Sequence, residues 1–186
     1  MNEDNIVLHV IDALIAADVP YMLVGSFSSN YYGIPRSTAD ADFVVQLGGK
    51  SIADLRQHLH GDLRLDPQAG FETITGTVKN VLKLAQSSFT VELFRLSDDA
   101  HDQERFRHRQ AVRLFERDVY LQTAEDVIIM KLRWCRKKDR EDIESVLGIQ
   151  QKNLDFTYIH RWCAVHGTRP LLDEIQASIP PLDDLE

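Results

Sequence analysis

The stretch that decides the fold is Val24-Gly25-Ser26, followed after thirteen residues by Asp40-Ala41-Asp42-Phe43. The apolar run that ends at Val24 predicts a buried strand, and the glycine and serine after it predict the start of a short helix. Side chains two residues apart on a strand point to the same side, with Cα atoms about 6.5 to 7 Å apart. Asp40 and Asp42 therefore project together if their segment is a strand.

Two carboxylates on one side of a strand repel each other unless a cation lies between them. Hard oxygen ligands suit Mg²⁺ or Mn²⁺, and two such ions about 3.5 to 4 Å apart can stabilise the attacking and leaving oxygens of a phosphoryl transfer. Gly25 allows close approach of the backbone to a phosphate, and Ser26 lies where a helix start presents N–H groups. The stretch thus predicts a nucleotide site, although two acids at a turn or strand edge are the alternative.

Glu92 supplies a third acid. It alternates with the apolar residues Val91 and Leu93, so it leaves the core face of its strand. If that strand lies beside the one carrying Asp40 and Asp42, three carboxylates converge. Glu92 would then be a metal ligand or the base that deprotonates an attacking hydroxyl. The alternative is a solvent-exposed strand glutamate.

The remaining pattern predicts a sheet followed by helices. The first part of the chain predicts a helix over 3–18, strands over 21–24 and 42–47, helices over 26–32 and 50–60, strands over 73–75, 81–84 and 89–94, a loop or exposed helix over 97–110, and a hairpin of 112–115 with 119–121. Thr123, with an acid three residues later, predicts a helix start. Further helices are expected in 139–147, 155–166 and 170–178, with Gly148 and Gly167 as stops.

Composition excludes several classes of protein. The 186 residues include 21 basic and 29 acidic ones, for a net charge of −8, whereas proteins that coat nucleic acid carry surplus Lys and Arg. The first five residues are acidic where a secretory signal is basic, and no apolar run reaches the roughly 18 residues that span a bilayer. Cys135 and Cys163 form no C-x-x-C pair. We therefore expect a cytoplasmic protein with no membrane partner and reduced cysteines.

The combination of Gly-Ser, a thirteen-residue spacer and Asp-x-Asp resembles the signature of the DNA polymerase β-like nucleotidyltransferase superfamily. Residues 34–42, 125–132 and 137–142 resemble its small bacterial branch related to AbiEii-type toxins, although Glu92 stands where aspartate is commoner and the chain is short for a full toxin. The resemblance covers about residues 5–178. It implies an α+β fold with a mixed sheet: a nucleotidyltransferase core over 1–121, a C-terminal helical bundle over 122–179 and a frayed tail over 180–186.

The segment from Lys131 to Arg140 contains six basic residues and one acid, a local charge of +5. Lys131 lies among apolar residues. This predicts either that its ammonium contacts a triphosphate or that its aliphatic stem lies over the core with the ammonium in solvent. Asp139 either orients Lys131 or Arg36, or caps the next helix. We assign Arg36, Lys131 and Asp139 to nucleotide binding together with Gly25 and Ser26. The other cations are expected to be solvated or to contact RNA phosphates.

These residues predict a metal-dependent nucleotidyltransferase. An acceptor hydroxyl attacks the α-phosphate of an NTP, Mg²⁺ or Mn²⁺ held by Asp40, Asp42 and Glu92 stabilises the transition state, and pyrophosphate leaves. The resemblance implies an RNA 3′ end as acceptor, a toxin role and an antitoxin partner. Two alternatives stay open: a non-catalytic nucleotide-sensing or protein-binding module, and an enzyme that nucleotidylates antibiotics or other small molecules.

Overall fold

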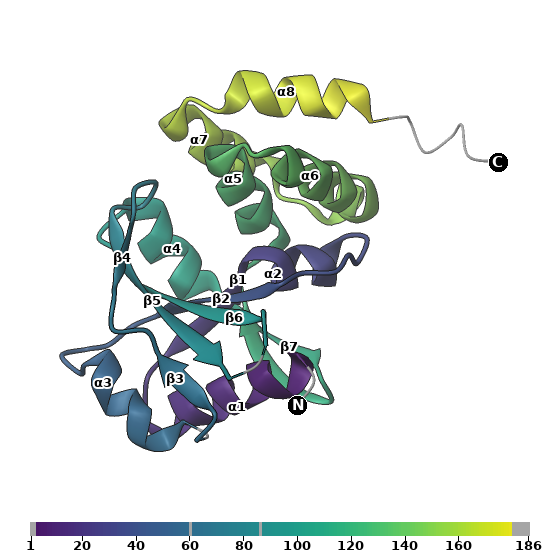
Figure 1. The fold of residues 1–186 in the computed structure, drawn as a ribbon. Helices are drawn as coiled ribbons and strands as arrows, with labels where there is room; N and C mark the ends of the chain where they lie inside the picture. The colour runs from purple at the N-terminus through teal and green to yellow at the C-terminus, as the bar shows by residue number, and fades with distance from the viewer. Residues whose placement is uncertain (1–2, 60, 86, 180–186) are drawn as a thin grey trace. The chain divides into compact units, whose positions relative to one another are not determined.

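The computed structural model describes residues 3–59, 61–85 and 87–179, which form two compact units (Figure 1). The first unit comprises the described residues up to Phe27 and those from Ser37 to Gln122, and the second comprises Ser28–Arg36 and the described residues from Thr123 onward. The division after Gln122 lies one residue beyond the expected end of the core, and the segment Ser28–Arg36 joins the helical unit. The expected frayed tail, 180–186, lies outside the described residues.

The first unit is built on one mixed sheet. Its described elements are α1 (Glu3–Ala16), β1 (Tyr21–Val24), the start of α2 (Gly25–Tyr32), β2 (Asp40–Val45), α3 (Ile52–Leu55) with the 3-10 turn η1 (Arg56–His58), β3 (Leu63–Leu65), β4 (Gly70–Glu72), β5 (Thr77–Leu84), β6 (Thr90–Arg95), α4 (Ala100–His108), β7 (Gln110–Leu114) and β8 (Arg117–Leu121). The strand order is β3-β5-β6-β2-β1-β8-β7, with β4 paired to β5. The pairs β2–β6 and β1–β8 are parallel and the others are antiparallel.

The two faces of the sheet are covered differently. Alternate residues of the central strands, among them Leu23, Phe43 and Leu93, pack with α1 and α3 in the larger core. The opposite alternation places Met22 and Val44 against Phe106 of α4, in a smaller cluster. Because α4 brings so few apolar residues to this second face, polar side chains of the same strands have room there.

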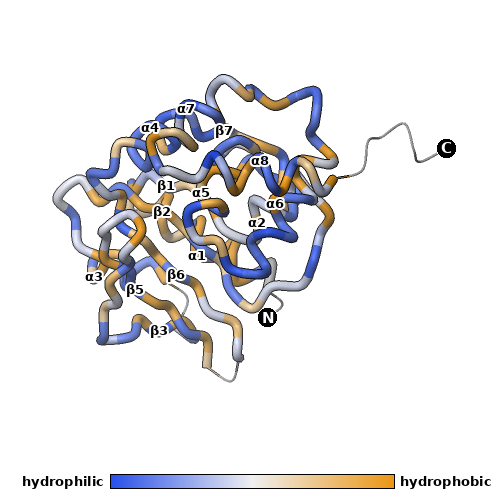
Figure 2. Tube along the Cα trace, turned by 90° about the horizontal axis from the view of Figure 1, so that it is seen from above, coloured by the Kyte–Doolittle hydropathy of each residue, from blue (hydrophilic) through white to orange (hydrophobic). Residues whose placement is uncertain are grey.

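The second unit is helical. It contains α5 (Ala124–Trp134), α6 (Lys137–Gln150), the 3-10 turn η2 (Gln151–Asn153), α7 (Phe156–His166) and α8 (Arg169–Ser178), around its own apolar core. Thr123 accepts the Asp126 N–H and so caps α5, as its sequence predicts. In Figure 2, α5 and α6 carry both hydrophobic and hydrophilic segments, as expected of helices with one buried face. The prediction of a mixed α/β sheet followed by a helical bundle is confirmed.

Several local expectations are wrong in whole or in part. Residues 73–75 form a turn, because the Glu72 carboxylate accepts the N–H groups of Ile74 and Thr75. Gly148 does not end its helix, since the buried neighbours Val146 and Leu147 carry α6 on to Gln150. The segment 97–110 contains α4, whose polar residues are not all exposed: Asp102 and Arg105 are buried and bonded to each other.

No helix within the described part of the chain has the length and apolar character needed to cross a bilayer.

Candidate active site

The two aspartates and the glutamate lie on neighbouring strands and on the same face of the sheet. β2 and β6 run parallel, with Asp40 opposite Thr90 and Asp42 opposite Glu92. Adjacent strands are about 4.8 Å apart, so the Asp42 and Glu92 side chains leave the sheet side by side. Their strand neighbours Ala41 and Val91 enter the larger core on the other face. The prediction that Glu92 leaves the core face beside the aspartate strand is confirmed.

Gly25 shapes the space around Asp42. Val24 pairs with Asp42 across β1 and β2, and Gly25 follows with a φ of +62°, a left-handed conformation that costs a residue with a Cβ about 1 to 2 kcal/mol. A Cβ built on Gly25 would lie 2.1 Å from Asp42 Oδ2 and 2.9 Å from its Cγ. The carboxylate of Asp42 therefore lies directly against the backbone at the start of α2, where the sequence predicts phosphate binding.

A hydrogen bond orients Asp40, the first acid of this group. Thr38 Oγ1 donates to Asp40 Oδ1 at 2.8 Å, which orients the first carboxylate. α2 begins at Gly25 rather than after Ser26, and the Ser26 side chain is buried, so a phosphate would contact its backbone N–H rather than its hydroxyl. Asp40, Asp42 and Glu92 are all half-buried, between core and solvent.

Lys79 is a site residue that sequence reasoning missed. Its Nζ donates to both carboxylate oxygens of Glu92, at 2.8 and 2.7 Å. Lys79 lies on β5, thirteen residues away from Glu92, and no motif joins the two. Only the register of β5 against β6, with Lys79 opposite Phe94, brings the ammonium to the acid.

The donor set on this face fits a divalent cation. Carboxylate oxygens are the ligands that Mg²⁺ and Mn²⁺ prefer, and two aspartates that leave one strand together supply them. The missing Cβ at Gly25 leaves the space in which the Asp42 carboxylate lies. Both carboxylate oxygens of Glu92 already accept hydrogen bonds from the Lys79 ammonium.

The structure places the other predicted nucleotide ligands together in the second unit, as an ion cluster. Lys131 Nζ, which is buried, donates to Asp139 at 3.1 Å and to Asp142 at 2.6 Å. Arg36 holds Asp142 with two parallel bonds, of 2.7 and 2.9 Å. Asp139 also accepts the backbone N–H and the side chain of Arg136 at the start of α6, so it both caps that helix and pairs with Lys131.

The cluster holds its carboxylates ionised. Burial by itself would raise the pKa of Asp142, but the hydrogen bonds from Arg36 and Lys131 outweigh burial and hold the pKa below its usual value. Burial likewise opposes ionisation of Asp139, and Arg136 and Lys131 together lower its pKa. Asp142 was not singled out for the site, although its spacing of three residues from Asp139 could have indicated that the two share a helix face.

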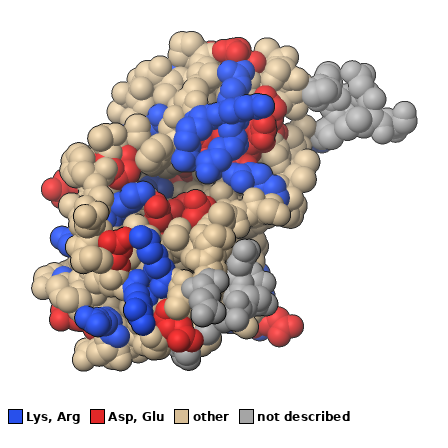
Figure 3. Space-filling model, in the orientation of Figure 1, with Lys and Arg blue, Asp and Glu red and all other residues tan. Residues whose placement is uncertain are grey.

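Acids outside the segment, Asp142 and Glu174, offset part of its local charge of +5, in which Asp139 is already counted. Lys131 is buried, Arg136 is bound by Asp139, and Arg140 pairs with Glu174 at 2.8 Å. Lys137 and Lys138 are exposed. On the face seen in Figure 3, the largest group of Lys and Arg side chains borders acidic ones. The surface thus offers RNA fewer unneutralised cations than the sequence suggested.

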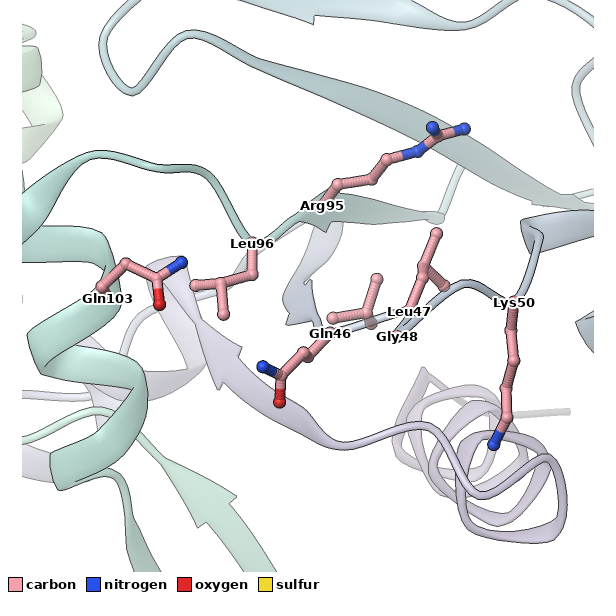
Figure 4. Close-up of a pocket in the computed structure, with 8 residues that line it drawn as sticks. Gln46, Leu47, Gly48, Lys50, Arg95, Leu96 and Gln103 are labelled. Carbon is pink, nitrogen blue, oxygen red and sulfur yellow. The ribbon is translucent and has the colours of Figure 1, made fainter.

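A separate pocket of about 330 Å³ lies at the other ends of the same strands (Figure 4). It is lined by residues that end or follow β2 and β6, including Gln46, Arg95 and Leu96, whereas Asp40 and Thr90 begin those strands. Lys50, at its edge, extends toward the end of α1 and donates to the Ala17 carbonyl at 2.9 Å. The pocket is therefore distinct from the acid face.

The mixed sheet and the helices that follow it form a nucleotidyltransferase fold. The solution structure of the antibiotic-resistance factor ANT(2″)-Ia is similar with a TM-score of 0.61 at 12% identity, over 93% of this chain and 95% of that chain. The crystal structure of ANT(2″)-Ia in complex with adenylyl-2″-tobramycin gives a TM-score of 0.57 at 12% identity, over 89% of this chain and 97% of that one.

An antigenic nucleotidyltransferase-like protein from Paracoccidioides brasiliensis has a TM-score of 0.56 at 17% identity, over 97% of this chain and 96% of that chain. No protein-family model matches the sequence, and no curated protein matches it. At these identities the likeness establishes the fold alone.

Proposed function

We propose that the protein is a metal-dependent nucleotidyltransferase that transfers an NMP from an NTP to an acceptor hydroxyl. The observation that carries this proposal is the juxtaposition of Asp40, Asp42 and Glu92 on one sheet face, with the Asp42 carboxylate against Gly25 at the start of a helix. A module that only senses nucleotides has no need of a third acid beside the two aspartates, so this arrangement favours the enzyme over the binding module.

Each residue has a role that its position allows. Asp40 and Asp42 would hold a divalent cation, which supplies charge stabilisation for the α-phosphate as it is attacked. The backbone at Gly25 and Ser26 would bind the phosphates. Glu92 stands beside the aspartates, as a further metal ligand or as the base that takes the acceptor's proton. The acceptor oxygen bonds to the α-phosphorus, the bond from that phosphorus to the bridging oxygen of the β-phosphate breaks, and pyrophosphate leaves.

The ion cluster limits what Arg36, Lys131 and Asp139 can contribute. Their assignment to nucleotide binding stays a prediction, and the pairs with Asp142 give them a structural use as well. Asp142 ties the segment Ser28–Arg36 to α5 and α6 within the second unit.

Two observations bear on the chemical nature of the acceptor. The offset charges between Lys131 and Arg140 disfavour a long RNA, and the fold is shared with an enzyme seen bound to adenylyl-2″-tobramycin. We therefore propose a small-molecule hydroxyl as the second candidate acceptor beside an RNA 3′ end. The cytoplasmic location, the AbiEii-type branch, the toxin role and the antitoxin partner stay predictions from the sequence.

The double variant Asp40→Asn, Asp42→Asn tests the site. It should weaken Mg²⁺-dependent binding of a non-hydrolysable NTP by more than about 100-fold, because even groups that only support a metal ligand are worth about 10- to 100-fold. Calorimetry measures the binding, and circular dichroism with thermal unfolding shows that the fold survives. Asp98→Asn, at an exposed acid of the same unit, is the control. Unchanged affinity in a folded double variant would refute the assignment.

A further inference from the structure

Lys79 reaches Glu92 along a route that the sheet defines. On the antiparallel pair β5–β6, Val81 is opposite Glu92 and Lys79 is opposite Phe94, so Lys79 and Glu92 are diagonal neighbours on one face. The ammonium lies 5.6 Å from the centre of the Phe94 ring. The position of the Lys79 ammonium is thus set by two side chains of β6, Glu92 and Phe94.

The neighbouring strand leaves room for the lysine stem. Gly70 on β4 is opposite Lys79, and a Cβ built there would lie 3.2 Å from Lys79 Cγ and 3.3 Å from its Cε. Any larger residue at this position would press on the stem. The stem therefore lies along β4, and the ammonium at its end reaches the acid face.

The pairing changes what Glu92 can do. Each carboxylate oxygen has two lone pairs, so an oxygen that accepts from Lys79 still has one left for a hydroxyl proton. A divalent cation at the same oxygens would instead bring its charge beside the Lys79 ammonium. The Lys79 side chain is 31% exposed, so solvent screens this repulsion only in part. Lys79 offsets the charge of Glu92, and the two carboxylates of Asp40 and Asp42 carry as much negative charge as one divalent cation carries positive charge.

We propose, on the basis of the nucleotidyltransferase function above, that Lys79 is a positioning residue that reserves Glu92 for the acceptor's proton. The cation is then held by Asp40 and Asp42 without Glu92. The hydroxyl proton passes to the Glu92 carboxylate, the freed electron pair of the oxygen forms the bond to the α-phosphorus, and the electron pair of the broken bond leaves on pyrophosphate. Lys79 gives up no proton in this step.

The number of bound ions tests the proposal without any turnover. Mn²⁺ bound per chain is counted by electron paramagnetic resonance in the complex with a non-hydrolysable NTP. The parent should bind one Mn²⁺. Lys79→Met, which removes the charge and shortens the side chain by only one heavy atom, should bind two. Lys79→Arg should return the count to one. Lys83→Met is the matched control, because Lys83 lies on the same strand and pairs with Asp66 instead.

Steady-state kinetics provide the second readout. Lys79→Met should lower kcat by about 100-fold with the KM for NTP nearly unchanged, since a misplaced reacting group costs about that much in rate while substrate binding persists. Lys79→Arg should recover most of the loss.

Several results would overturn the proposal. If the parent protein binds two Mn²⁺ ions per chain, that result alone refutes the proposal, even if Lys79→Met fails to fold. A folded Lys79→Met that still binds one ion with unchanged kcat does so as well. A parent that binds neither nucleotide nor Mn²⁺ would refute the proposed function itself, and this outcome is distinct from a count of two.

Discussion

Gly25→Ala separates the two roles of this glycine, its backbone conformation and the space that it leaves for Asp42. The first cost follows from the φ of +62°, which an alanine adopts at a penalty of about 1 to 2 kcal/mol. For a chain of this length, each kcal/mol lowers Tm by about 2 to 4 °C. The stability effect should therefore be modest.

The second cost falls on the site. A Cβ at Gly25 would lie 2.1 Å from Asp42 Oδ2, where an ordinary contact is at least 3.4 Å, so the carboxylate must move by about 1.3 Å. A displacement of about 1 Å of a reacting or ligating group costs on the order of 100-fold. We expect metal-dependent NTP binding to weaken by about that factor.

Gly76→Ala is the matched control. Gly76 has a φ of +69° and no atom within 4 Å of the position that a Cβ would take, so it shares the backbone penalty without the clash. Both variants are compared by thermal unfolding and by calorimetric titration with Mn²⁺ and a non-hydrolysable NTP. Equal affinities for the two variants would refute the argument that Gly25 is required for the placement of Asp42.

Two further predictions concern the helical unit. Asp142→Asn should lower the free energy of unfolding by about 3 to 5 kcal/mol at pH 7, because it removes a buried carboxylate that holds two cations, whereas Asp173→Asn in an exposed pair should change it by less than about 1 kcal/mol. Since the pKa of Asp142 is lowered in the fold, its contribution to stability is present above about pH 3.9 and is lost as the pH falls through the folded-state pKa. Urea unfolding should therefore show the difference in unfolding free energy between the parent and Asp142→Asn narrowing below about pH 3.9. A constant difference down to pH 3 would contradict this prediction. Binding of a short single-stranded RNA, followed by fluorescence anisotropy, should show a slope of log K against log salt of about −1.4 for two phosphate contacts. The double variant Lys137→Glu, Lys138→Glu should abolish that binding, whereas Lys152→Glu should not. A slope steeper than about −4 would mean several more phosphate contacts and would support an extended RNA-binding surface instead.

Local features of the chain were predictable from the sequence because they depend on neighbours a few residues apart. The alternation around Asp40 and Asp42 follows from the period of a strand, and the cap at Thr123 follows from a hydroxyl and backbone N–H groups one helical turn away. The same reasoning failed at Gly148, where the helix continues because packing of its buried neighbours outweighs a local preference of about 1 kcal/mol.

The sequence by itself indicated the class of fold and placed Asp40 and Asp42 on the same side of a strand, because the period of a strand and a Gly-Ser turn depend on short stretches of sequence. That Glu92 lies beside them depended on the pairing of β2 with β6. Only the tertiary structure decided which cations pair with the acids, both on the sheet face and in the helical unit. Lys79 reaches Glu92 through the register of two strands, and Arg36 meets Asp142 across 106 residues. Such pairings depend on long-range packing. From the sequence, many residues of the same charge are equally plausible partners for a given acid, and only folding brings one of them within hydrogen-bond distance.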